Sequence, residues 1–128
     1  MEISSILIVD DNEINRDICA LNLEHMHVPL HFAENGRDGL KIAREIVPDL
    51  ILLDVMMPVM DGYQTAREIR KQPRFYDLPI IALTAKALKE DRHKCIAAGA
   101  NDYLSKPVDV ERLFSTLRVW LYRRECIL

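Results

Sequence analysis

The sequence has little that would suit it to a membrane or to nucleic acid. Its 128 residues contain no apolar run near the roughly 20 residues that cross a bilayer, and the N-terminus has no basic, signal-like segment. Aromatic residues make up 6%, few for stacking on bases, and the net charge of -3 provides no basic surface. The four glycines are scattered, so a glycine-rich phosphate loop is absent. We expect no membrane partner, no nucleic-acid partner and no nucleotide site.

Cysteine is also scarce. Cys19, Cys95 and Cys126 are odd in number and far apart, which is typical of a reduced, cytoplasmic protein. Hydrophobic residues make up 49% and charged residues 29%, as in ordinary globular domains, and no linker or repeat interrupts the chain. We therefore expect residues 1–128 to form one domain.

Apolar runs alternate regularly with helical patterns. Strands are predicted at residues 5–9, 30–33, 50–54, 80–83 and 101–105. Helices are predicted from the cap Asn12 to about Met26, through Leu40 to Val47, and over residues 62–71, about 88–98 and from 109 onward. This order predicts an α/β fold: a parallel sheet with right-handed crossovers and helices on both faces.

Two of the buried strands end in acids. The run at residues 50–53 delivers Asp54, and the first strand delivers Asp10 and Asp11, to the sheet edge where α/β proteins bind ligands. Three carboxylates at one edge raise each other's pKa values unless a cation joins them, and Mg²⁺ suits such oxygen ligands. Each Asp alone could instead be a helix cap or a solvated turn residue.

The remaining strands add a hydroxyl, Thr84, and a cation, Lys106. No Ser–His or Cys–His pairing accompanies them, so the pattern indicates a carboxylate nucleophile beside a metal, with partners for phosphoryl oxygens. His25, His27 and His31 could be read as a second metal cluster, but nothing in the sequence fixes them on one surface.

Four motifs, in order and at matching spacing, resemble the receiver domains of two-component response regulators, above all those of hybrid histidine kinases and single-domain regulators. They are residues 9–12 (VDDN), 53–62 (LDVMMPVMDG), 83–85 (LTA) and 105–107 (SKP). The resemblance covers nearly the whole chain and implies a flavodoxin-like fold with strand order 2-1-3-4-5.

The resemblance also implies a ligand set. Asp54 would accept a phosphoryl group from a phosphohistidine, and Asp10 and Asp11 would hold Mg²⁺ together with Asp54 and the backbone carbonyl oxygen of Met56.

Further roles follow from the same resemblance. Thr84 would bond the acyl phosphate, Lys106 would pair with it, and Tyr103 would be a rotating aromatic switch. The phosphodonor would be a histidine kinase or a histidine phosphotransfer protein, meeting outward residues such as Ile14. The face formed by the fourth helix, last strand and last helix would be the output or homodimer surface.

Such a domain phosphorylates itself from a donor and is not a turnover enzyme in the usual sense. One alternative is a Mg²⁺-dependent phosphatase acting through an aspartyl phosphate, which would want a second acid just after Asp54, where Val55 and Met56 stand. Another is a receiver-like module that binds partners without phosphorylation. A free-standing regulator and a piece of a hybrid kinase are both compatible with the sequence.

Overall fold

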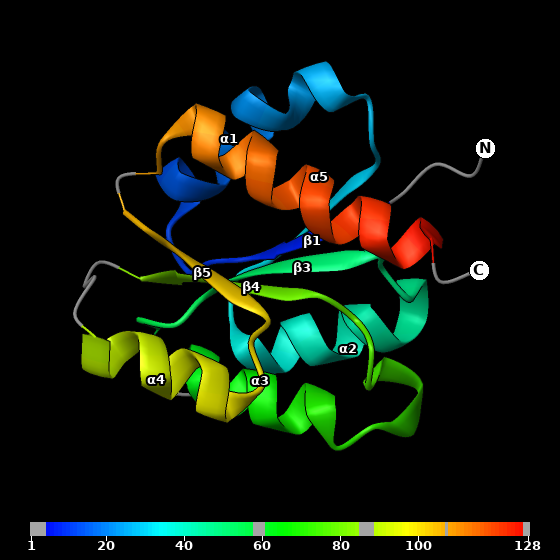
Figure 1. Ribbon diagram of the computed structural model, residues 1–128, viewed down its shortest axis with the longest axis vertical. Coiled ribbons are helices and arrows are strands. Elements are labelled where there is room, and N and C mark those ends of the chain that lie inside the picture. The colour runs from blue at the N-terminus through cyan, green and yellow to red at the C-terminus, as the bar shows by residue number, and fades with distance from the viewer. Residues whose placement is uncertain (1–4, 58–60, 85–88, 107, 127–128) are drawn as a thin grey trace.

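The computed structural model describes residues 5–57, 61–84, 89–106 and 108–126. Five strands form one parallel sheet in the order β2-β1-β3-β4-β5, and five α-helices connect or follow them (Figure 1). This confirms the predicted fold class and strand order. In chain order the elements are β1 (Ile6–Val9), α1 (Glu13–Leu23), β2 (Leu30–Ala33), α2 (Gly36–Ile46), β3 (Leu50–Asp54), α3 (Gly62–Arg70), β4 (Ile80–Thr84), α4 (Lys89–Ala98), β5 (Asp102–Ser105) and α5 (Val110–Cys126).

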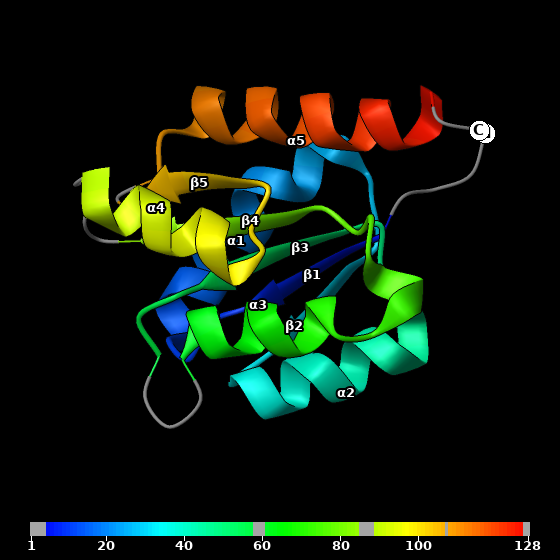
Figure 2. The same cartoon turned by 60° about the horizontal axis from the view of Figure 1, so that its bottom comes forward.

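The sheet separates two hydrophobic cores. Figure 1 shows α1 and α5 above the sheet and α2, α3 and α4 below it, and Figure 2 gives the same arrangement turned by 60°. The first core joins the sheet to Leu23 of α1 and Leu117 of α5, and the second joins it to Ala43 of α2 and Ile69 of α3. Every residue of β1, β3 and β4 is buried, because strands covered on both faces need apolar side chains on both sides.

The strand registers bring the carboxyl ends of four strands to one edge. Val9 of β1 lies beside Leu53 of β3, and Thr84 of β4 lies beside Ser105 of β5. The residue after β1, the last residues of β3 and β4, and the residue after β5 are therefore neighbours in space. This edge is the place where the sequence predicts the site.

Three local features differ from the sequence prediction. The α-helix predicted to reach Met26 ends at Leu23 and continues as a 3-10 turn over Glu24–Met26. Val47, predicted inside the second helix, instead ends it in a left-handed conformation with φ 48°. Pro48 disfavours the right-handed helical conformation at this position. A short 3-10 helix at Pro73–Phe75, which the pattern did not predict, leads into β4.

Helices α1 and α4 pack through narrow surfaces. On α1, Cys19 and Leu23 are buried while Ile14, Ile18 and Leu21 remain exposed, which confirms that its broad apolar pattern partly faces outward. Among the described side chains of α4, Cys95 and Ala98 are buried and Ile96 is exposed. No helix within the described ranges has both the length and the apolar character of a bilayer span.

Candidate functional site

Four predicted side chains meet at the carboxyl edge of the sheet. Asp10 follows β1, Asp54 ends β3, Thr84 ends β4 and Lys106 follows β5. Parallel pairing fixes their approach, since the backbone N–H of Lys106 donates to the carbonyl of Thr84 at 2.8 Å. The sheet thus gathers residues separated by up to 96 positions in the sequence.

Three carboxylates form the acidic part of this edge. One oxygen from each of Asp10, Asp11 and Asp54 lies within 4.8 Å of the other two. Asp10 and Asp54 are buried, at 1% and 3% exposure, while Asp11 is exposed. Buried carboxylates so close together repel unless positive charge lies among them. The cluster therefore offers oxygen ligands of the kind that a hard divalent cation prefers.

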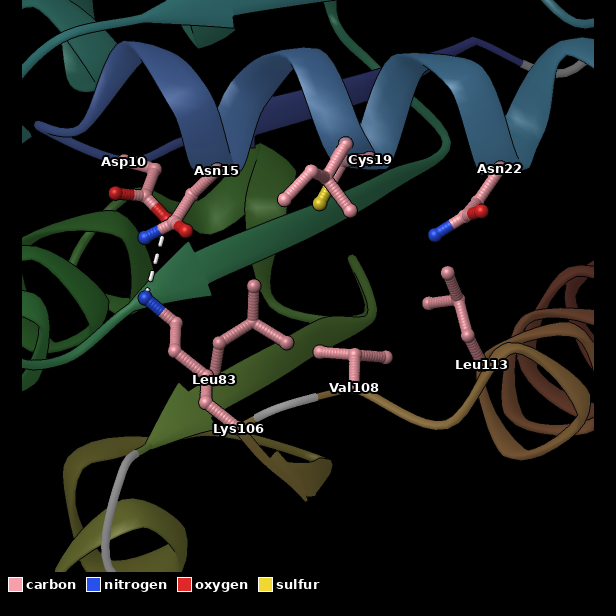
Figure 3. A pocket seen from close by; sticks show the side chains of 9 residues that line it. Asp10, Asn15, Cys19, Asn22, Leu83, Lys106, Val108 and Leu113 are labelled. Carbon is pink, nitrogen blue, oxygen red and sulfur yellow. Dashed lines mark hydrogen bonds and ion pairs between the residues drawn. The ribbon is translucent and has the colours of Figure 1, made fainter.

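Lys106 supplies a positive charge from the opposite side. Its Nζ lies 3.2 Å from Oδ2 of Asp10 and 3.3 Å from Oδ2 of Asp54. Figure 3 shows this side chain reaching across the strand ends toward Asp10. A single ammonium therefore bridges the two buried acids, as an ion pair with 23% exposure on the lysine side.

The electrostatic balance shifts both groups upward in pKa. Burial raises the pKa of Asp54, and the charge of Asp10 raises it further, while the Met56 N–H and Lys106 oppose the rise. Burial alone would lower the pKa of Lys106, but the carboxylates of Asp54 and Asp10 outweigh it and raise that pKa. Lys106 therefore holds its proton more firmly, and ionisation of Asp54 carries an electrostatic cost.

Backbone groups orient the two buried acids. The N–H of Asn12 donates to Oδ1 of Asp10 at 3.0 Å, and the N–H of Met56 donates to Oδ1 of Asp54 at 2.9 Å. Gly62 lets α3 start directly against this loop: an added Cβ would lie 2.5 Å from the carbonyl oxygen of Asp54 and closer still to the Cα of Val55. Any side chain at position 62 would push the Asp54 loop aside.

The remaining predicted residues surround this centre. Thr84 is buried at 1% exposure at the end of β4, beside the strand that carries Asp54. The Met56 side chain is 51% exposed, and Tyr103 on β5 is half-buried against the core beneath α4. The guanidinium of Arg92 on α4 lies 5.4 Å from the centre of the Tyr103 ring, a contact that the sequence analysis missed.

The histidines whose side chains the structure describes take no part in this cluster. Within the described part of the chain, the group of at least three potential metal ligands is Asp10, Asp11 and Asp54. His27 is exposed and His31 is half-buried on β2, while the side chain of His25 lies outside the described residues. The acidic edge is therefore the metal-binding candidate of this structure.

A small apolar pocket adjoins the acidic edge. It has a volume of about 160 Å³ and lies between α1 and α5, with Asp10 and Lys106 at one end (Figure 3). Ile18 and Cys19 of α1 and Leu113 of α5 are among the residues that line it. Burial raises the pKa of the Cys19 thiol, with Asp10 adding to the effect, so this thiol is a poor nucleophile.

Comparison with known proteins identifies the family. The family model of the response regulator receiver domain matches residues 6–118. The chain belongs to this family, as the four motifs predict. It is therefore a receiver domain of two-component signalling.

Two curated relatives show the range of proteins that carry this domain. Protein PilH of Pseudomonas aeruginosa is 39% identical over 117 residues, covering 91% of the chain and 96% of PilH. The DNA-binding dual master transcriptional regulator RpaA of Synechocystis is 37% identical over 122 residues, covering 95% of the chain. The chain spans about half of RpaA, 51% of its length.

Two solved structures share the fold closely. The receiver domain of sensor histidine kinase PA1611 from Pseudomonas aeruginosa, solved with a magnesium ion coordinated in its active site cleft, has a TM-score of 0.86 at 38% identity, covering 94% of this chain and 98% of that one. The receiver domain of Ssk1 from Saccharomyces cerevisiae, co-crystallised with the histidine phosphotransfer protein Ypd1, has a TM-score of 0.89 at 30% identity, covering 95% and 91%.

Proposed function

We propose that this receiver domain, taken as residues 1–128, accepts a phosphoryl group on Asp54 from a phosphohistidine donor, with Mg²⁺ bound beside the acceptor. The observation that carries the proposal is the convergence of three carboxylates within 4.8 Å of one another, with the Lys106 ammonium 3.3 Å from Asp54. A carboxylate nucleophile in such a setting suits phosphoryl transfer, which depends on positioning and on charge stabilisation.

In the proposed step, an oxygen of Asp54 attacks phosphorus while the bond from phosphorus to the histidine nitrogen breaks. The N–H of Met56 holds Oδ1 of Asp54 at 2.9 Å and so fixes the orientation of the carboxylate. Lys106 offsets the negative charge of the phosphoryl oxygens at the place where it now pairs with Asp54. The hydroxyl of Thr84 donates to the acyl phosphate from the neighbouring strand.

The donor set fits Mg²⁺. Asp10, Asp11 and Asp54 provide carboxylate oxygens, and the backbone carbonyl of Met56 completes the protein ligands that we propose. Mg²⁺ commonly combines one or two carboxylates with water and a phosphate, and when bound it would supply positive charge to the transferring group. Because Asp11 is exposed, an ion bound at this cluster would be open to solvent and to the donor.

Phosphorylation is proposed to switch the output face. Thr84 would turn toward the phosphate, Tyr103 would turn inward behind it, and α4 would shift with α5. The face formed by α4, β5 and α5 would then contact an output partner or a second copy of the domain. Val119 is exposed on that face, whereas the Trp120 indole already donates to Asp102 at 3.1 Å.

The phosphodonor is proposed to dock on α1. Ile14, Ile18 and Leu21 are 68%, 49% and 66% exposed, and their spacing places them along one side of the helix, next to the pocket at the acidic edge. A donor protein seated there would bring its phosphohistidine close to Asp54. The Ypd1–Ssk1 co-crystal structure supports a histidine phosphotransfer protein as one such donor. A histidine kinase is the other donor that we propose.

The two alternatives are less well supported. A phosphatase of this type would need a second acid after Asp54, and the two following residues are buried Val55 and a methionine. A binding module without phosphorylation would not need two buried acids bridged by a lysine. Receiver domains are typically not turnover enzymes. Cys19 and Cys95 are buried and form no disulfide, which supports the cytoplasmic location that we propose.

Intact-mass measurement tests the proposal. We expect acetyl phosphate with Mg²⁺ to add one phosphoryl group to the protein, and chelation of the ion to prevent the addition. Phosphorylation that proceeds equally well without Mg²⁺ would contradict the metal-assisted step. No addition from acetyl phosphate or from any phosphohistidine donor would contradict the acceptor role itself.

A further inference from the structure

Arg16 is a charged residue held close to the acidic edge. It lies on α1, and its side chain is only 14% exposed. A guanidinium is seldom buried to this extent without a specific set of partners. The partners of this side chain therefore indicate its role.

The guanidinium joins two loops. Nη1 donates to the backbone carbonyl oxygen of Asp10 at 2.7 Å, and Nη2 lies 3.8 Å from Oε1 of Glu34, the residue after β2. The bond to Asp10 is short and made by an ionised donor, so it is the stronger contact. The pair with Glu34 is long, and the Glu34 side chain is 75% exposed, so water weakens it.

Asp10 is held at every polar position. Its N–H donates to the carbonyl of Ala33 at 3.1 Å, its Oδ1 accepts from the Asn12 N–H at 3.0 Å, and its Oδ2 pairs with Lys106 at 3.2 Å. Arg16 secures the carbonyl. That carbonyl belongs to the peptide unit between Asp10 and Asp11, so its direction sets the direction in which the Asp11 side chain leaves the backbone.

We propose that Arg16 is a positioning residue for the metal site: through the Asp10 carbonyl it fixes the Asp10–Asp11 peptide so that both carboxylates converge with Asp54 on one ion. The inference rests on the proposed function, because it assumes that Mg²⁺ binds at this cluster. It adds a residue that touches none of the ligand oxygens and acts through the backbone alone.

The rigid guanidinium of arginine matters for this role. It donates to the Asp10 carbonyl from a fixed plane, whereas the lysine ammonium is a point charge on a flexible stem. A lysine at position 16 keeps the positive charge near the cluster but does not fix the direction of the carbonyl. The two effects, charge and geometry, can therefore be separated by substitution.

The test is Mg²⁺ titration of the purified protein, followed by the backbone amide shifts of Asp54 and Met56. We expect Arg16→Ala to weaken Mg²⁺ binding about 10- to 100-fold, as is typical when a residue supporting a metal ligand is removed. Arg16→Lys should weaken it nearly as much. Urea unfolding of each variant measures its stability separately from its Mg²⁺ binding. If Arg16→Ala does not fold, Arg16→Lys provides the test.

Two control variants match the change. Arg74→Ala removes an arginine that also donates to a backbone carbonyl, that of Arg44 at 2.8 Å, but one on α2 away from the acidic edge. Glu34→Gln removes the exposed partner of Arg16 and leaves the Asp10 contact in place. Both should bind Mg²⁺ as the parent protein does.

Each outcome decides a different question. Parent-like Mg²⁺ affinity in Arg16→Ala would overturn the positioning role. Full affinity in Arg16→Lys would overturn it too, because the positive charge alone would then account for the contribution of Arg16 to Mg²⁺ binding. If Arg74→Ala weakens Mg²⁺ binding as much as Arg16→Ala does, the change in net charge explains the effect. That result would also overturn the positioning role. The proposed function, rather than the role of Arg16, fails if Mg²⁺ does not shift the amides of the parent protein. It fails likewise if Asp54→Asn keeps the same Mg²⁺-dependent shifts.

Discussion

Asp54 is the residue at which folding and function conflict most directly. It is buried, it lies near the equally buried Asp10, and its raised pKa records the electrostatic cost. The folded protein therefore keeps the Asp54 proton to a higher pH than the unfolded chain, whose carboxyl titrates near 3.8. Ionisation of Asp54 lowers the free energy of unfolding. This cost is absent below pH 3.8 and reaches its full size once the pH exceeds the pKa of Asp54 in the folded protein.

Asp54→Asn should therefore stabilise the protein in Mg²⁺-free buffer. The amide keeps the acceptor oxygen for the Met56 N–H, and Lys106 keeps its pair with Asp10, while the repelling charge is gone. We expect a gain on the order of 1 kcal/mol at pH 7, measured by urea unfolding. The gain should shrink as the pH falls toward the unfolded value of 3.8.

A surface carboxylate provides the control for that gain. Asp17→Asn changes an exposed side chain on α1 and should alter stability little. Mg²⁺ should stabilise the parent protein more than Asp54→Asn, because the substitution removes a ligand. A loss of stability in Asp54→Asn without Mg²⁺ would show that the Lys106 pair outweighs burial and repulsion.

Met56 governs the lifetime of the phosphorylated state in our account. Its side chain is 51% exposed beside Asp54 and offers a thioether, a weak acceptor that orients water poorly. We predict that Met56→Asn and Met56→Glu speed the loss of the phosphoryl group severalfold without preventing its addition. The measurement is the decay of phosphorylated protein after removal of the donor.

Val119→Asn is a matched control for this substitution, since Val119 is also 51% exposed but lies on α5. Its decay should equal that of the parent protein. An unchanged or slower decay in both Met56 variants would show that this side chain does not control access of the attacking water.

At the scale of elements, α4 is held by smaller buried side chains than α5. The described buried residues of α4 are Cys95 and Ala98, two small side chains, whereas α5 buries Leu113, Leu117 and Leu121. Burial of large aliphatic side chains is what anchors a helix to a sheet. The polar contacts at the edges of α4, such as Arg92 on Tyr103, add little area.

Hydrogen exchange should therefore find α4 to be a low-stability helix. We predict that amides of residues 92–98 exchange faster than those of residues 113–121 in α5. Beryllofluoride with Mg²⁺ should then change the amide shifts of α4 and of Tyr103, because the switch acts on the loosely held element. Shifts confined to the acidic edge, with α4 and Tyr103 unaffected, would argue against the proposed switch.

Element boundaries show where sequence patterns stop being informative. Apolar runs, apolar spacing and the cap or turn residues together located the five strands and five helices of the described chain. They did not locate the end of α1 at Leu23 or the left-handed Val47, since these depend on local backbone geometry and on the next residue. The same limit explains the missed turn at Pro73–Phe75.

At the scale of the whole molecule, parallel topology is what makes the site predictable. Acids and a lysine that follow buried parallel strands must share one edge, so the sequence places Asp10, Asp54 and Lys106 together before any coordinates are known. The contacts of Arg16 and Arg92 could not be predicted in this way. Long, flexible side chains reach a carbonyl or a ring with no periodic pattern to mark the contact.

Phosphotransfer from a phosphohistidine donor protein, with the modified residue mapped, shows whether Asp54 is the acceptor. We predict one phosphoryl group on Asp54 of the parent protein, none on Asp54→Asn, and parent-like transfer to Asp61→Asn, which keeps a capping side chain at the start of α3. Transfer to Asp54→Asn at the parent rate, or a phosphoryl group mapped to another residue of the parent protein, would contradict it.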